Sequence, residues 1–268
     1  MLGSRKRNVL GVLVDAVARD SAVAAIIDAA RERQRLTVSA LAVHGVMTGV
    51  LDREHRYRLN HLDLVVPDGQ PVRWALNLLH AARLPERVYG PDLMLDVCAK
   101  AAERGLPVYF YGSRSETLES LCRNLTARYP GLVIAGAQGS RFRRLSPPER
   151  VATVEAIRRS GAAIVFIGLG CPRQEVWAYE YGRELNIPLI AVGAAFDFHA
   201  GNLKRAPASL QRAGLEWLYR LLQEPRRLWR RYLFLNPSYL ALLVVQALRL
   251  HAFDGGSATQ PTHDVSYG

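Results

Sequence analysis

Cysteine is scarce in this sequence of 268 residues. The three cysteines are an odd number and show no paired spacing; they are Cys98, Cys122 and Cys171. Such a set does not indicate a disulfide framework or a zinc site of the kind that closely spaced cysteines build. We therefore expect the thiols to be small core residues in a reducing compartment.

Long apolar runs are also missing. The apolar stretch near the C-terminus is divided by Asn-Pro-Ser at 236–238. This leaves about a dozen residues for a helix, fewer than the ~20 that a bilayer span needs. A helix lying in a membrane interface, or packed on the body of the protein, fits this length better. Basic residues 5–7 precede an apolar run, but Asp15 interrupts it and no small-residue cleavage site follows, so we predict no signal peptide.

Acidic residues are outnumbered, with 24 Asp and Glu against 35 Lys and Arg and a net charge of +11. This balance predicts an anionic partner: nucleic acid, a phosphorylated ligand or an anionic membrane. Much of the excess falls in residues 204–231, where only Glu216 and Glu224 oppose it. The basic residues of this segment are Lys204, Arg205, Arg212, Arg220, Arg226, Arg227, Arg230 and Arg231.

The hydrophobic content of 49% is typical of a folded globular protein. Apolar runs alternate with amphipathic stretches, which predicts an α/β fold with a Rossmann-like, mostly parallel sheet flanked by helices. The predicted strands are 9–14, 36–41, 62–66, 108–111, 133–137, 163–167 and 189–192. The predicted helices are 19–33, 70–82, 92–104, 115–128, 147–160 and 172–185.

The pattern divides the chain into three parts. Residues 1–203 form the predicted α/β catalytic core. Residues 204–253 are basic, aromatic and helical, with one or two helices over 207–232 that are interrupted near Pro225. Residues 254–268 carry Gly, Ser, Thr and Pro, and we predict that this tail is disordered.

Four stretches outside the apolar strands carry the polar residues of a predicted active site. They read VVPDGQPV at 65–72, PERVYGPDL at 85–93, GLGCPRQE at 168–175 and GAAFDFHAG at 193–201. Each has the character of a loop after a buried strand, and open parallel sheets bind ligands beyond the carboxyl ends of their strands. We therefore expect these four stretches to meet.

Asp68 is the most specific candidate for a catalytic residue in these stretches. It follows the apolar strand through Pro67 and precedes Gly69, which places a carboxylate at a strand end. Pro-Asp-Gly is also a common turn tripeptide, so the residues alone leave a structural turn open.

The GLGCPRQE stretch has the features of an anion site. Gly168 and Gly170 permit close backbone approach, and Pro172 is typical of a helix start whose N–H groups attract anions. Two glycines lack the spacing of a full dinucleotide fingerprint. A nicotinamide-dependent oxidoreductase would also need that fingerprint after the first strand, where residues 15–17 read Asp-Ala-Val.

Together, these motifs and their order resemble the WecG/TagA/CpsF glycosyltransferase family of bacterial cell-surface polymer synthesis, over most of residues 8–250. The resemblance implies an inverting glycosyltransferase in which Asp68 is the general base that takes the acceptor hydroxyl proton. It assigns donor and phosphate binding to Arg87, Gly168, Gly170, Gln174 and Asp197. By residue type alone, Arg87 fits an exposed loop equally well.

This chain departs from the family pattern at one element. Family members carry Thr-x-Asn after the second strand, where this chain has Ser39 in the threonine position and Leu41 in place of the amide. Ser39 is our candidate for an acceptor contact. Asp197 and His199 would share one side of an extended segment, and we expect His199 to be packed or to line a ligand, since no second metal ligand stands near it.

The C-terminal segment interleaves arginines with Trp217, Tyr219, Trp229, Tyr232 and Phe234, a mixture suited to a lipid headgroup region. A solvated helix face is the alternative. In the family this appendage engages the membrane and completes the active site, which makes Arg220, Arg227 and Arg230 candidates for the acceptor diphosphate.

The implied reaction moves an N-acetylmannosamine-type sugar from a UDP-sugar to a polyprenyl-diphosphate-linked saccharide. The implied location is cytoplasmic and peripheral, on the inner face of the membrane, and family members can self-associate into homo-oligomers. We expect no cofactor and no metal, since arginines and helix N-termini can supply the counter-charge of the diphosphate. The alternatives are transfer of another UDP-hexose or uronic acid, and a nucleic-acid-binding module built on the arginine-aromatic segment; we expect no nucleic-acid partner.

Overall fold

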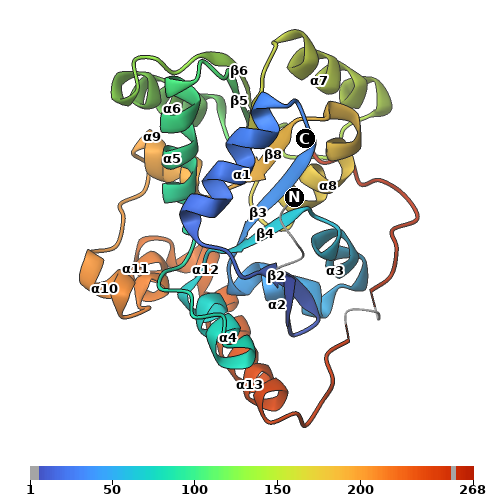
Figure 1. Cartoon of the computed structure of the whole chain (residues 1–268), viewed down its shortest axis with the longest axis vertical. Helices are drawn as coiled ribbons and strands as arrows, with labels where there is room; N and C mark the ends of the chain where they lie inside the picture. The colour runs from blue at the N-terminus through green and yellow to red at the C-terminus, as the bar shows by residue number, and fades with distance from the viewer. Residues whose placement is uncertain (1–5, 255–257) are drawn as a thin grey trace.

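The computed structural model describes residues 6–254 and 258–268, and its centre is a parallel sheet of six strands (Figure 1). The strand order is β4-β3-β8-β7-β5-β6, and every neighbouring pair is parallel. The predicted α/β, Rossmann-like fold is confirmed. The strands are β3 (Leu36–Leu41), β4 (Leu64–Pro67), β5 (Val108–Gly112), β6 (Ile134–Gln138), β7 (Ile164–Gly168) and β8 (Pro188–Ala191).

Helices cover both faces of this sheet and bury two hydrophobic cores. Because side chains alternate along a strand, Val165 and Ile167 of β7 enter one core, and Ile164 and Phe166 enter the other. The first core is closed by α2 (Val43–Leu51), α3 (Arg53–Asn60), α4 (Gln70–His80), α7 (Pro147–Arg159) and α8 (Arg173–Leu185). The second is closed by α1 (Arg19–Arg31), α5 (Gly90–Glu103), α6 (Ser115–Arg128) and α9 (Ala195–Ala200).

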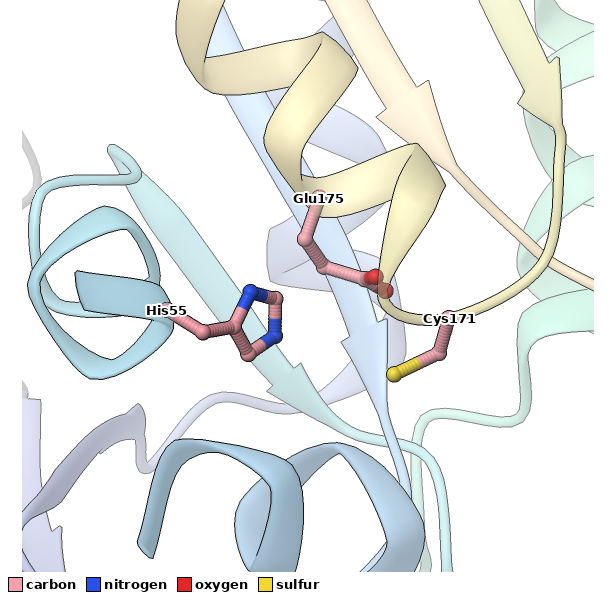
Figure 2. Close-up of side chains that lie close together, drawn as sticks. All are labelled: His55, Cys171 and Glu175. Atoms are coloured by element: carbon pink, nitrogen blue, oxygen red, sulfur yellow. The ribbon is translucent and has the colours of Figure 1, made fainter. Parts of the chain in front are cut away.

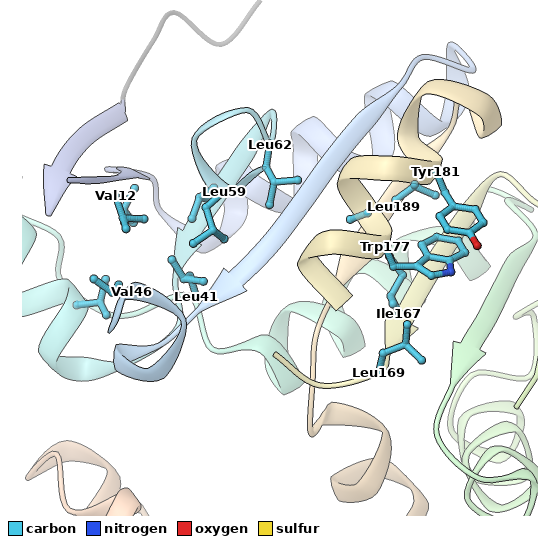
Figure 3. Packing of buried hydrophobic residues seen from close by; sticks show 14 of the residues in the cluster. Val12, Leu41, Val46, Leu59, Leu62, Ile167, Leu169, Trp177, Tyr181 and Leu189 are labelled. Carbon is cyan, nitrogen blue, oxygen red and sulfur yellow. The ribbon is translucent and has the colours of Figure 1, made fainter. Parts of the chain in front are cut away.

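An aromatic stack fixes α8 on the first core (Figure 3). The rings of Trp177 and Tyr181 are parallel, with centroids 4.2 Å apart, and Tyr111 of β5 stacks on Trp177 at 4.8 Å. All three side chains are fully buried. The N-terminal turn of α8, which carries the Arg-Gln-Glu motif, is thereby held in a fixed position relative to the sheet.

The first predicted strand is wrong in detail. The chain forms a two-stranded antiparallel hairpin of β1 (Lys6–Val9) and β2 (Val12–Asp15), because Leu10 and Gly11 both adopt positive φ values and make a tight turn. The prediction also missed α2 and α3. The sequence of α3, REHRYRLN, has almost no apolar periodicity, so its helix follows from packing and from the Asp52 cap rather than from pattern.

The C-terminal appendage is a chain of short helices: α10 (Ala208–Arg212), α11 (Glu216–Gln223), α12 (Pro225–Arg230), the π-helix η1 (Arg231–Leu235) and α13 (Asn236–Ala247). The predicted interruption near Pro225 is confirmed, since that proline begins α12. The predicted division at residues 236–238 is wrong, because Leu235 and Asn236 keep helical dihedrals and η1 runs directly into α13. None of the helices formed by the described residues has the length and apolar character to cross a bilayer.

The part of the tail at 258–268 departs from the predicted disorder, and residues 255–257 of that prediction lie outside the described residues. The backbone N–H groups of Val265 and Ser266 donate to the carboxylate of Glu180 in α8, at 2.7 and 2.9 Å. Gly268 donates to the carbonyl of Arg143 at 3.0 Å. These hydrogen bonds attach the end of the described chain to the catalytic core.

The buried face of α3 gives the first testable prediction. Leu59 is fully buried and Leu51, at the end of α2, is 73% exposed. We predict that Leu59→Ala lowers the free energy of unfolding by about 2–5 kcal/mol, because it leaves a cavity, whereas Leu51→Ala changes it by about 0.5 kcal/mol or less. Urea denaturation followed by circular dichroism measures both. Equal effects of the two substitutions would contradict the packing described here.

Candidate active site

A cavity of about 670 Å³ lies at the carboxyl edge of the sheet. Its walls are the segments that follow β3, β4, β5, β7 and β8, together with residues of α11 and α12. The four predicted stretches therefore meet, as parallel strands require. The predicted site residues that line this cavity are Asp68, Gly168, Gly170, Gln174, Asp197, Arg220 and Arg227.

A second cavity, of about 140 Å³, adjoins the first on the side of the appendage. The two share Asp68, Tyr89 and Arg220. The smaller cavity adds Arg87 from the core and Glu216 from the appendage. Asp68 thus stands at the boundary of the two cavities, both of which are lined in part by the appendage.

Local hydrogen bonds hold Asp68 in this position. Its N–H donates to the carbonyl of Leu41 at 3.1 Å, which ties the end of β4 to the end of β3. Its Oδ1 accepts the N–H of Gly90, in the first turn of α5, at 2.6 Å. Burial raises the pKa of Asp68 to about 6, while Arg87 and the Gly90 hydrogen bond oppose that rise. The side chain is therefore a carboxylate at neutral pH with an enhanced proton affinity, as a general base requires.

Arg87 lies in the site and not on an exposed loop, since its side chain is only 12% exposed. Its guanidinium sits over the Tyr89 ring at 4.1 Å and donates to Glu216 Oε2. The Tyr89 hydroxyl donates to the other oxygen of Glu216 at 2.6 Å. Burial opposes the charge on Arg87, but Asp68 and Glu216 outweigh it and raise the pKa of the guanidinium. A fixed cation therefore stands beside the proposed base.

Two further arginines reach the larger cavity from the appendage. Arg220 and Arg227 both donate to Glu224, at 3.1 and 2.7 Å. Arg220 also lies over the Phe198 ring at 5.4 Å. Arg230 lies outside both cavities, with its guanidinium 5.2 Å from the centre of the Trp229 ring, so the structure separates it from the other predicted acceptor arginines.

The loop after β7 can approach a ligand closely because of its glycines. A Cβ atom on Gly168 would stand 2.4 Å from the Phe196 ring, so no larger residue fits. Gly170 has a φ of +76°, and its N–H donates to Gln174 Oε1 at 3.1 Å. Gln174 Nε2 donates in turn to Glu175 Oε1 at 2.8 Å. Gln174 therefore shapes this loop as well as lining the cavity.

Ser39 occupies a different place from the predicted one. It is fully buried, lines neither cavity, and donates to Glu175 Oε1 at 3.2 Å. The adjacent Leu41 does line the larger cavity. Contact of Ser39 with an acceptor stays a prediction, and the geometry places the residue behind Glu175 instead.

Asp197 and His199 lie on α9, so the extended segment predicted for them is wrong. On a helix, residues two apart point in different directions. Asp197 lines the larger cavity, whereas His199 Nε2 contacts the carbonyl of Pro91 at 2.9 Å. Burial lowers the pKa of His199, which agrees with the packed, neutral role expected for it.

Sequence reasoning missed several residues of the site. Ser113, Arg114 and Thr117 line the larger cavity, and the rule that ligands bind after parallel strands would have found the first two after β5. Asn202 also lines it. Glu216 carried no sequence signal, because an acid in the first turn of a helix is common.

Comparison with known proteins decides the family. The model of the glycosyl transferase WecG/TagA/CpsF family matches residues 7–252. The chain belongs to this family. It is therefore a glycosyltransferase, and the expectation drawn from the four motifs is confirmed.

Two relatives of this WecG/TagA/CpsF protein are N-acetylglucosaminyldiphosphoundecaprenol N-acetyl-beta-D-mannosaminyltransferases. The one from Bacillus subtilis (strain 168) is 31% identical over 196 residues, which cover 72% of this chain and 73% of the relative. The one from Bacillus spizizenii (strain ATCC 23059 / NRRL B-14472 / W23) is 33% identical over 188 residues, or 69% and 70%.

The raised pKa of Asp68 predicts the pH dependence of this glycosyltransferase. Only the ionised carboxylate accepts a proton, so kcat/KM should fall about tenfold per pH unit below the pKa and level off above about 6. The residual rate of Asp68→Asn should lack this inflection. Initial rates across a constant-ionic-strength buffer series measure it. A rate that is flat through this range, or that falls as pH rises through about 6, would contradict the assignment.

Proposed function

We propose that this glycosyltransferase moves an N-acetylmannosamine-type sugar from a UDP-sugar to a polyprenyl-diphosphate-linked saccharide, in cell-surface polysaccharide or teichoic acid synthesis. The observation that carries the proposal is the position of Asp68, at the boundary of two cavities and beside Arg87 and Arg220. The names of the Bacillus relatives support the sugar and the lipid acceptor.

The larger cavity suits the donor. Ligand pockets for small molecules have volumes of about 300–1,000 Å³, and this cavity falls within that range. The glycine loop at 168–170 permits close backbone approach, and Arg114, Arg173 and Arg227 place positive charge along its wall. A nucleoside diphosphate needs both features, since its phosphates must be neutralised while its sugar lies against the sheet edge.

The smaller cavity suits the reactive end of the acceptor. It is formed jointly by core and appendage, and it contains the aromatic rings of Tyr89, Trp217 and Tyr232 beside Arg87 and Arg220. Aromatic rings pack against sugar faces, and guanidinium groups bind phosphate oxygens. An acceptor sugar placed here has its hydroxyl next to Asp68.

The chemistry follows from these positions. Asp68 takes the proton of the acceptor hydroxyl as that oxygen attacks the anomeric carbon in line, and the bond to UDP breaks on the opposite side. Negative charge grows on the leaving diphosphate, where the arginines and the N–H groups near the start of α8 can stabilise it. The product has the inverted anomeric configuration.

One observation favours a second donor. Leu41 stands where family members carry an amide, and its side of the larger cavity therefore lacks a hydrogen-bonding group at that point. A hydrogen bond to a sugar substituent would be lost there. Another UDP-hexose or a uronic acid donor is the alternative that this replacement supports.

The transfer reaction tests the proposal. Purified protein is mixed with lipid-diphosphate-linked N-acetylglucosamine and a panel of UDP-sugars, while UDP release and the mass of the lipid product are measured. We predict a product heavier by one N-acetylhexosamine, and a kcat lower by about 10²–10⁴-fold in Asp68→Asn with UDP-sugar affinity unchanged.

Two results would contradict this function. No UDP release with any donor, from folded protein with lipid present, would remove the proposed reaction. Weakened donor binding with full turnover at saturation in Asp68→Asn would remove the proposed base. Transfer of a different sugar would favour the alternative donor, which is another UDP-hexose or a uronic acid donor.

We also propose that the enzyme is cytoplasmic and bound peripherally to the inner face of the membrane. Leu240 and Val244 of α13 and its C-cap residue Leu248 are each more than half exposed and recur every four residues, so they form one stripe along the helix. Leu233 and Phe234 of η1 are also exposed. Apolar side chains next to a basic segment are suited to the headgroup region of an anionic membrane.

The stripe on α13 gives a specific prediction. Leu240→Gln combined with Val244→Gln should lower partitioning into anionic vesicles by on the order of tenfold per residue, because apolar contact with the bilayer is lost. Vesicle sedimentation measures it. Leu51→Gln, an exposed leucine on α2, serves as the matched control and should sediment like the unaltered protein. Unchanged sedimentation of the double variant would contradict the membrane face.

A further inference from the structure

Three side chains of metal-ligating types lie close together at the wall of the larger cavity, and Figure 2 shows how they face one another. His55 comes from α3, Cys171 from the turn before α8, and Glu175 from the first turn of α8. One nitrogen, sulfur or oxygen atom from each lies within 4.8 Å of the others. Cys171 and Glu175 are four residues apart, but His55 is distant from both in the sequence, so no ligand spacing revealed the set.

Two members of the cluster carry buried polar atoms without a hydrogen bond. His55 is 2% exposed, and neither of its ring nitrogens has a partner among the described residues. Glu175 is fully buried, and its Oε2 also lacks one within that part of the chain. An unsatisfied buried polar group costs about 1–3 kcal/mol, and an ion held by one His55 nitrogen and by Glu175 would satisfy two of these atoms.

We propose that His55, Cys171 and Glu175 bind one divalent transition-metal ion of the zinc class. Nitrogen, thiolate sulfur and carboxylate oxygen are the donor atoms that Zn²⁺ takes, whereas Mg²⁺ and Ca²⁺ take oxygen. A thiolate and a carboxylate carry two negative charges and neutralise the dication, which makes a buried site electrostatically balanced. This inference is independent of the proposed sugar and acceptor.

The ligand separations agree with this metal. Bonds of about 2.0–2.3 Å in a tetrahedron place two donor atoms roughly 3.3–3.8 Å apart. The donor atoms of the cluster lie within 4.8 Å of one another, so a pair needs to close by at most about 1.5 Å to reach these separations.

Neighbouring residues orient the ligands as they do around bound metals. Ser39 and the side-chain amide of Gln174 both donate to Glu175 Oε1, at 3.2 and 2.8 Å, and this holds the carboxylate in one rotamer. Such partners of the ligands set their geometry in metal sites. The hydrogen bond from Ser39 to Glu175 also gives Ser39 a structural role that does not depend on contact with the acceptor.

The metal would fix the loop that faces the cavity. Cys171 and Glu175 both line the larger cavity, and between them the chain turns into α8. Bonds from this turn to His55 would pin it against α3 and so set the position of Gly170 and Gln174. Three protein ligands also leave a fourth position for water, as in zinc sites that are not closed.

Cobalt(II) is the probe for this site. We expect chelator-treated, full-length protein to bind one equivalent of Co²⁺, with the thiolate-to-cobalt charge-transfer band and the intense visible bands of tetrahedral coordination, both removed by Zn²⁺. Cys171→Ser should lose the charge-transfer band, whereas Cys122→Ser, which alters another half-buried cysteine, should keep it. Zn²⁺ should raise the Tm of the unaltered protein and of Cys122→Ser only.

His55→Gln is the second variant, and it keeps the test decisive if Cys171→Ser does not fold. It should lose tight Co²⁺ binding while circular dichroism shows a native fold. Absence of the cobalt bands in the unaltered protein would overturn the proposal. Bands that persist in both Cys171→Ser and His55→Gln, or that disappear in Cys122→Ser, would place the metal elsewhere and overturn it equally.

Discussion

The buried carboxylate of Glu216 connects the appendage to the catalytic edge of the sheet. It accepts hydrogen bonds from both Arg87 and Tyr89 of the core. Removing one partner of a buried ion pair typically costs about 3–5 kcal/mol, because the other charge is left uncompensated. Glu216 also contributes to the raised pKa of Asp68. The docking of the appendage and the electrostatics of the proposed base therefore depend on one contact.

This contact constrains how a phosphorylated substrate can bind. Arg87 has five N–H donors, and a diphosphate offers more negative charge than Glu216 does. A phosphate that enters the smaller cavity must share Arg87 with Glu216 or replace it. In either case the charge around Asp68 would change, so the proposed function implies that acceptor binding and the ionisation of Asp68 are coupled.

The sequence predicted the catalytic edge better than it predicted the appendage. Buried parallel strands produce apolar runs, and the polar residues that follow them meet at one edge, which is why Asp68, Gly170 and Asp197 could be placed together. Glu216 and Arg87 are 129 residues apart, and their pairing depends on tertiary packing that local periodicity does not encode. The helix α3 was missed for the same reason, since its charged sequence is stabilised by contacts made elsewhere in the fold.

Two groups of buried polar side chains near the site have different consequences for the structure. Arg87 and Glu216 satisfy one another, so that pair holds two parts of the chain together without a ligand. His55 and Glu175 leave polar atoms without a hydrogen bond among the described residues, and the proposed metal ion would satisfy one atom of each. Because Gln174 bonds to both Gly170 and Glu175, the proposed metal ion would be connected to the loop facing the cavity through this amide. The structural and catalytic parts of the site are therefore linked through one amide side chain.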